Sequence, residues 1–74
     1  MPADSMPQRI WRLRKLGHAV DAEIQTARPD AWTVHFLYDG VLAYRRTWPD
    51  REQALADAGA RRAELERSGW MAHW

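Results

Sequence analysis

The chain has 74 residues, enough for one domain and too few for a second. Its composition of 46% hydrophobic and 28% charged residues is typical of a folded chain, and 11 basic against 10 acidic side chains give none of the strong positive charge of most nucleic-acid-binding domains. No cysteine is present, which excludes disulfides and thiolate sites, and no long apolar run or signal-peptide pattern occurs, so we expect a cytoplasmic protein without membrane contact.

Residues 1–8 contain two prolines and several polar side chains, and we expect them to form a flexible leader. The remaining residues, 9–74, then form a single domain that ends in a tryptophan-rich tail. No internal repeat or low-complexity tract follows the leader, so the elements of this domain can be taken one by one.

Residues 9–27 have the alternation of a β-hairpin. In the second half of this segment, small and apolar side chains alternate with Asp21, Glu23 and Gln25. A two-residue turn at Leu16-Gly17 gives one register that satisfies both faces. This register pairs Leu13 with Val20 and Trp11 with Ala22 on one face, and Arg12 with Asp21 on the other.

A short helix is the competing prediction for residues 9–16. Ser5 and Gln8 have the spacing of a capping box, and Ile10 and Leu13 followed by Gly17 suit a helix that ends in a glycine cap. We favour the strand because its two faces agree on one register.

A second hairpin is predicted around Asp39-Gly40, and its loop length decides which side chains share a face. A two-residue loop would place Arg45 on the face of the tryptophan that precedes the turn. We therefore predict a three-residue loop, Tyr38 to Gly40, with Gly40 as a left-handed bulge residue. This register gathers Trp32, Val34, Phe36, Leu42, Tyr44 and Trp48 on one face and leaves Thr33, His35, Leu37, Val41, Ala43, Arg45 and Thr47 on the other.

A helix is predicted from Asp50, as its N-cap, to about Ser68, with Gly69 as the left-handed C-cap. Its core-facing stripe is dominated by alanine, so it can lie close to a sheet face crowded with tryptophan. The stripe consists of Ala54, Leu55, Ala58 and Leu65. The predicted fold class is α+β, a four-stranded antiparallel meander packed against one C-terminal α-helix.

The tail from Trp70 to Trp74 holds two tryptophans and a methionine, which are costly to leave in water. One interpretation is that the tail folds over a thin core and completes it. The other is that it anchors a partner protein, because tryptophan is enriched at binding hot spots.

Residues with catalytic or metal-binding chemistry do not form a recognisable motif. His18, His35 and His73 lack the spacing of metal ligands, and the carboxylates of Asp21 and Glu23 face arginines as a charged surface would. No serine is placed as a nucleophile, and no glycine-rich phosphate loop is present. We therefore expect a protein that is not an enzyme and needs no cofactor or metal.

Our first hypothesis for the function is a small interaction module that binds another protein, with self-association as a homodimer included. An exposed strand edge, the open face of the sheet or the tail would form its surface. The alternative is binding of single-stranded nucleic acid on the open face through its arginines. The candidate partner-binding residues are Arg12, Arg14, His35, Arg45, Arg46, Trp70 and Trp74.

The spacing of turn and strand residues resembles that of small bacterial proteins without a characterised function. The pattern consists of Trp11-x-Leu13, Gly17, Trp32, Asp39-Gly40, Arg45 and Gly69-Trp70. It covers most of the chain, and because its members are strand, turn and cap residues it implies no functional site. The predicted ββββα order is also similar in architecture to the PC4-like, Whirly and Pur-repeat folds, which bind single-stranded nucleic acid.

Overall fold

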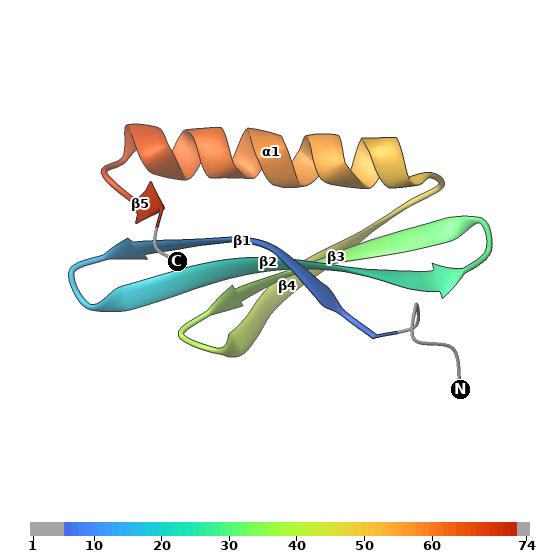
Figure 1. Ribbon diagram of the computed structural model, residues 1–74, viewed down its shortest axis with the longest axis horizontal. Helices are drawn as coiled ribbons and strands as arrows, with labels where there is room; N and C mark the ends of the chain where they lie inside the picture. Colours follow the sequence, from blue (N-terminus) through green and yellow to red (C-terminus); the bar gives the residue numbers. More distant parts are fainter. Residues whose placement is uncertain (1–5, 73–74) are drawn as a thin grey trace.

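A five-stranded antiparallel sheet with one helix on a single face makes up the computed structural model, which describes residues 6–72 (Figure 1). The elements are β1 (Gln8–Lys15), β2 (His18–Arg28), β3 (Ala31–Tyr38), β4 (Val41–Trp48), α1 (Arg51–Arg67) and β5 (Met71–Ala72). The strand order is β4-β3-β2-β1-β5, so the first four strands form a meander. The predicted α+β meander with a C-terminal helix is confirmed.

The β1–β2 hairpin has the predicted register. Trp11 lies opposite Ala22, Leu13 opposite Val20, and Arg12 opposite Asp21. Leu16 and Gly17 form the turn with φ angles of 52° and 82°, so both central residues adopt the left-handed conformation of the turn type that matches strand twist. The helical alternative for residues 9–16 is wrong.

The β3–β4 hairpin differs from the prediction in its loop. Tyr38 pairs with Val41 and Leu37 with Leu42, so Asp39-Gly40 is a two-residue turn, with φ angles of 51° and 84°. The register then shifts by one residue, and Phe36 lies opposite Tyr44. A bulge at Ala43 is the physical reason, because the extra residue returns the rest of β4 to the expected faces.

The bulge changes the faces of two side chains. Leu42 lies opposite Leu37 on the face away from the helix, whereas the three-residue loop had placed it among the core residues. Val41 lies opposite Tyr38, which contacts Trp70 on the helix side, and not on the open face. Both predictions for these two residues were therefore wrong.

Helix α1 begins at its expected N-cap, where the Asp50 carboxylate accepts the Gln53 backbone N–H at 2.8 Å. Its C-terminus has the paired hydrogen bonds of a glycine cap, from Gly69 N–H to the Glu66 carbonyl and from Trp70 N–H to the Leu65 carbonyl. Ala54 and Ala58 are fully buried, so the helix lies close to the sheet.

Tryptophan side chains fasten α1 to the sheet. The Trp11 indole N–H donates to the Ala58 carbonyl at 3.0 Å, and the Trp48 indole N–H donates to Asp57 at 3.1 Å. The Arg51 guanidinium lies 5.9 Å from the ring centroid of Trp32. Buried tryptophans with satisfied N–H groups contribute a large apolar area to a thin core.

The short strand β5 was not predicted. Met71 pairs with Arg14 and Ala72 with Leu13, so the chain returns along the outer side of β1 after the helix cap. Two residues are too few to give a periodic pattern. Trp70 packs at the margin of the core, whereas the predicted role of Trp74 lies outside the described residues.

Candidate functional site

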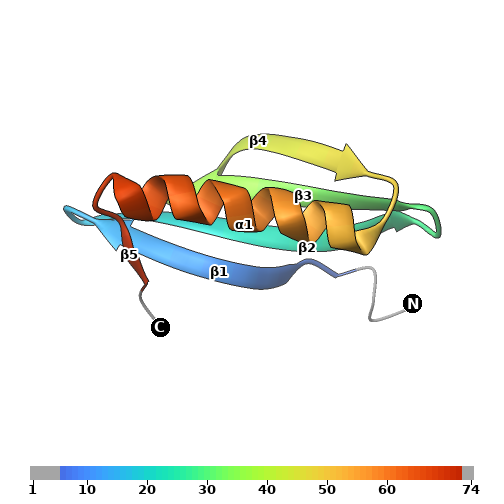
Figure 2. The same ribbon diagram turned by 90° about the horizontal axis from the view of Figure 1, so that it is seen from above.

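Strand β4 is the most exposed of the four long strands. Seven of its eight residues, Val41 to Thr47, are exposed, while β2 and β3 bury most of their central side chains. Seen from above, α1 lies over β2 and β3, with β1 along one side of it and β4 along the other (Figure 2). The outer side of β4 has no neighbouring strand among residues 6–72. We refer to Val41–Trp48 as the β4 edge.

Exposed apolar side chains gather at the start of this edge. Val41 is 70% exposed, Leu42 47%, and the two tyrosines that flank them are also exposed. Four of the seven large apolar side chains that are exposed in the described part of the chain fall between Tyr38 and Tyr44. Clusters of this kind on a small domain mark contact surfaces more often than isolated exposed residues do.

An apolar cavity of roughly 210 Å³ opens between the C-terminal half of α1 and the β3–β4 hairpin. The Phe36 and Tyr44 rings are stacked with centroids 4.8 Å apart, and Tyr38 meets Trp70 edge to face at 6.3 Å. The large side chains that line the cavity are Phe36, Tyr38, Tyr44, Leu65 and Trp70. We call this cavity the aromatic pocket.

The cationic side chain of Arg61 lines the aromatic pocket, and Arg46, Arg61 and Arg67 line the adjoining hollow between β4 and α1. The Arg61 guanidinium lies 5.9 Å from the Tyr44 centroid and donates to Glu64 at 3.3 Å. Arg46 lies 3.7 Å from Asp57, and Arg67 also lines the hollow. The Asp57 carboxylate accepts the Trp48 indole N–H through one oxygen and faces the Arg46 guanidinium with the other. Both of its oxygens are therefore already engaged within the protein.

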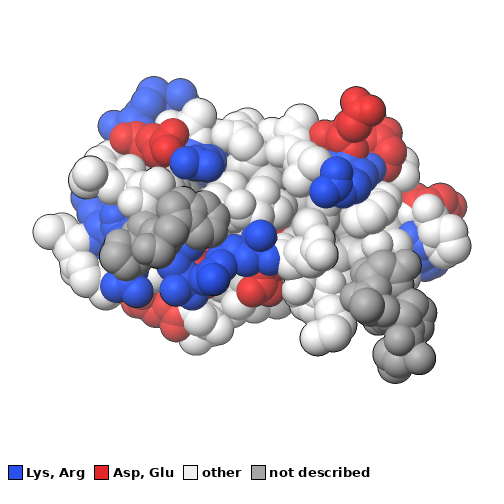
Figure 3. All heavy atoms as spheres, viewed as in Figure 1, with Lys and Arg blue, Asp and Glu red and all other residues white. Residues whose placement is uncertain are grey.

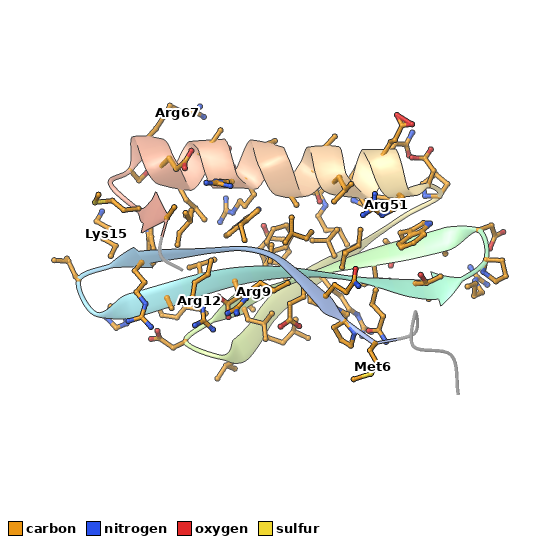
Figure 4. The ribbon with its side chains drawn as sticks, viewed as in Figure 1. Met6, Arg9, Arg12, Lys15, Arg51 and Arg67 are labelled. Carbon is orange, nitrogen blue, oxygen red and sulfur yellow. The ribbon has the colours of Figure 1, made fainter. Side chains whose placement is uncertain are left out.

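Arg12, one of the predicted partner-binding residues, is held by an internal ion pair. Its guanidinium binds both carboxylate oxygens of Asp21, at 2.6 and 3.0 Å, and Asp21 is only 7% exposed. These hydrogen bonds, and then the charge of Asp21, raise the pKa of Arg12 above its ordinary value. Arg12 and Arg9 lie under β1 on the face away from α1, within a band of basic side chains (Figures 3 and 4).

The other predicted residues do not form one site. Arg14, His35 and Arg45 lie on the face away from α1, where Arg45 pairs with His35 across β3 and β4. Arg46 and Trp70 lie on the helix side, in the hollow and the aromatic pocket. Trp74 lies outside the described residues. The predicted set is therefore divided between two faces of the sheet.

Sequence reasoning missed the exposed residues of the β3–β4 hairpin. Tyr44 and Leu42 were assigned to the core, and Val41 was treated as an exception near the turn. One available signal was the position of β4 as the last strand of a meander, because a strand with a single neighbour is covered least. Apolar residues at both sides of a turn in such a strand predict an exposed cluster.

The turn of this hairpin is held by Asp39. Its carboxylate accepts the Ala19 backbone N–H at 2.8 Å and lies 2.7 Å from His18 Nδ1, while its own N–H donates to the Ala19 carbonyl. The His18 contact, followed by the Ala19 N–H, lowers the pKa of Asp39 below its ordinary value. His18 also stacks on Tyr38 at 5.4 Å, so this group, the Asp39 clasp, positions one wall of the aromatic pocket.

Within residues 6–72, no three histidine or carboxylate side chains converge as metal ligands would. No helix of the described residues is both long and apolar enough to span a membrane. Compared with family models, with characterised proteins and with solved structures, the chain has no match. The geometry and chemistry of the β4 edge and the aromatic pocket are therefore the grounds on which a function can be argued.

Proposed function

We propose that the protein is a non-catalytic interaction module of the cytoplasm that binds an extended segment of a partner protein along the β4 edge. The observation that carries the proposal is the coincidence of an eight-residue strand whose outer edge has no neighbouring strand among residues 6–72 with an exposed apolar cluster and an aromatic pocket beside it. Each of these features is a common surface element, and together they supply the parts that strand addition requires.

Strand addition uses the backbone for affinity and the side chains for selection. A terminal strand presents alternate N–H and C=O groups on its outer side, and an incoming strand pairs with them. The β4 edge offers a length of about 26 Å at roughly 3.3 Å per residue. Side chains of the incoming strand on the helix side would lie beside Tyr44 and Arg46, next to the aromatic pocket.

Binding of single-stranded nucleic acid on the open face has less support. Arg9, Arg14 and Arg45 lie on that face, but the Trp, Tyr and Phe side chains of the described strands are on the helix side, where they pack against α1 or one another. Single-stranded nucleic acid is bound mainly by basic grooves with aromatic platforms on which bases stack. The open face has basic side chains but no Trp, Tyr or Phe side chains of the described strands on which bases could stack.

The proposal is tested by selecting displayed random peptides of about ten residues, long enough to span β4, on the immobilised full chain. Amide chemical shifts of the ¹⁵N-labelled protein then locate the binding of a selected peptide. We expect the largest changes in β4 and around the aromatic pocket. Changes confined to Arg12, Arg14 and the open face of β1 and β2 would overturn the proposal.

A matched pair of variants isolates the apolar cluster. The double substitution Val41→Gln and Leu42→Gln, which adds no charge, should weaken peptide binding by about tenfold or more, as loss of a central apolar contact does. Met6→Gln is the control, because Met6 is 65% exposed and lies away from the β4 edge (Figure 4). Equal affinity of the two variants would count against the β4 edge. Sedimentation equilibrium of the wild type would reveal a homodimer, in which case a second copy competes for this edge.

A further inference from the structure

We propose that the segment bound by the β4 edge is acidic and carries one aromatic or large aliphatic anchor that enters the aromatic pocket. This inference rests on the proposed function and specifies the chemistry of the partner. It follows from the charges along β4, from the shape and lining of the pocket, and from the consequences of pairing β4 with a second copy of itself.

Charge around the β4 edge is predominantly positive although the whole chain is nearly neutral. Arg45 lies on one face of the strand and Arg46 on the other, while Arg61 and Arg67 line the hollow on the helix side. The two carboxylates of the same hollow, Asp57 and Glu64, are already engaged with Arg46 and Arg61. Arg45 makes no ion pair with any described residue and remains available to a partner strand; Arg67 makes none either, but its side chain lies on the side of α1 away from the sheet (Figure 4).

The two arginines of β4 would face both sides of an added strand. Side chains of successive residues in a strand point to opposite faces, so one set would lie beside Arg45 and the other beside Arg46, whose side chain is 56% exposed and whose guanidinium lies 3.7 Å from the Asp57 carboxylate. Opposite charges across neighbouring strands each contribute roughly 0.2–1 kcal/mol, and like charges oppose pairing. An incoming strand with a carboxylate on each of its two faces, one beside Arg45 and one beside Arg46, therefore complements the site.

The aromatic pocket selects an anchor. Its volume of roughly 210 Å³ and its lining by Phe36, Tyr44 and Trp70 suit a ring or a branched aliphatic side chain, with which tyrosine and tryptophan walls pack well. Arg61, over the outer face of Tyr44, can reach a carboxylate next to that anchor. Anchors that fill such pockets commonly dominate the affinity of an interface.

A second copy fits this edge less well than an acidic strand. Antiparallel pairing of two β4 strands about a two-fold axis would bring Arg45 and Arg46 of one copy close to the same arginines of the other. Like charges on adjacent strands are destabilising, and the bulge at Ala43 further interrupts pairing. Charge complementarity thus favours an acidic segment of another protein over self-association.

To test this inference, the composition of the peptides selected on the wild-type chain is determined, and the charges of one selected peptide are then reversed. We expect the enriched sequences to be net acidic with one aromatic or large aliphatic residue. A selected peptide and its twin, in which lysine replaces each acidic residue, are titrated by fluorescence anisotropy. The acidic peptide should bind at least about tenfold more tightly at low salt, and the ratio should fall as salt rises from about 20 to 200 mM.

Variants of Arg45 separate charge from shape. Arg45→Glu should weaken the acidic peptide and strengthen its lysine twin, whereas Arg45→Gln should lie between, and Arg28→Glu serves as the control on an exposed arginine at the far end of β2. Selected peptides that bind β4 without acidic enrichment, or twins of equal affinity, would overturn this inference and leave the proposed function intact. Peptides whose affinity is unchanged by Val41→Gln and Leu42→Gln would overturn both.

Discussion

The two hairpins of the meander have the same kind of turn but differ in how deeply their strands are buried. In β1–β2, the side chains of Trp11 and Leu13 are almost completely buried beneath α1. In β3–β4, the outer strand is exposed along seven of its eight residues. Figure 2 shows β1 and β4 on opposite sides of α1, but β1 is also paired with β5, whereas β4 has no second neighbouring strand among residues 6–72. Both strands of the first hairpin contribute core residues, whereas in the second hairpin β3 contributes Val34 and Phe36 to the core and β4 supplies accessible surface.

Removing an aromatic side chain from each hairpin should give the largest contrast. Trp11→Ala removes a buried ring and its hydrogen bond to the Ala58 carbonyl, and should cost about 3–5 kcal/mol of unfolding free energy. Tyr44→Ala removes a ring that is 38% exposed and stacked on Phe36, and should cost about 1 kcal/mol. Urea unfolding followed by circular dichroism measures both.

Trp11→Phe provides a milder version if Trp11→Ala does not fold. It keeps most of the buried area and loses the indole N–H, so it should fall between the wild type and Trp11→Ala. Similar losses for Tyr44→Ala and Trp11→Phe would be compatible with the contrast, whereas a larger loss for Tyr44→Ala than for either Trp11 variant would contradict it.

The same contrast explains which features could be predicted from the sequence. In β1–β2, burial on one face and the Arg12–Asp21 pair on the other both depend on register, so only one pairing satisfied them. In β3–β4, a three-residue loop and a two-residue turn with a bulge place Trp32, Phe36, Tyr44 and Trp48 on the same face. Alternation alone could not distinguish them, and the side chains between turn and bulge were misplaced.

The candidate site was only partly predictable for the same reason. Arg45 and Arg46 were identified from their place in the last strand, but the aromatic pocket depends on where α1 crosses the sheet and where Trp70 turns back after Gly69. Neither position can be predicted from the local periodicity of the sequence. Arg12 was named as a binding residue because its partner Asp21 was expected on an exposed face, whereas it is almost fully buried.

The turns themselves differ in how well their residues suit the left-handed conformation. Leu16 adopts a φ of 52° although its side chain is 89% exposed and gains little from burial. A bulky residue in this region costs roughly 1–2 kcal/mol, and asparagine tolerates it better. Leu16→Asn should therefore raise the unfolding free energy by about 1 kcal/mol, measured by urea unfolding. Leu16→Ala, which keeps the strain and removes the side chain, should change it little. A destabilised Leu16→Asn variant would show that the exposed leucine side chain has a packing role in the fold.

Substitution of Asp39 should give the smallest change in unfolding free energy among these variants, and the change that depends most on pH. The pKa of Asp39 is lowered by His18 and by the Ala19 N–H, so the ionised form is favoured in the folded state. A carboxyl whose pKa is lowered in the folded state contributes stability that is fully present above its unfolded-state pKa of about 4 and is lost as pH falls through its folded-state pKa.

The Asp39→Asn variant keeps a residue suited to the turn and a side-chain oxygen that can accept the Ala19 N–H, but it removes the charge. The stability difference between wild type and Asp39→Asn should therefore shift in favour of the variant as pH falls below about 4. Urea midpoints from neutral to acid pH measure this difference, in which the contributions of the other carboxylates cancel. A difference that stays constant across the acid range would mean that the Asp39 clasp holds the second hairpin by geometry alone, without a contribution from charge.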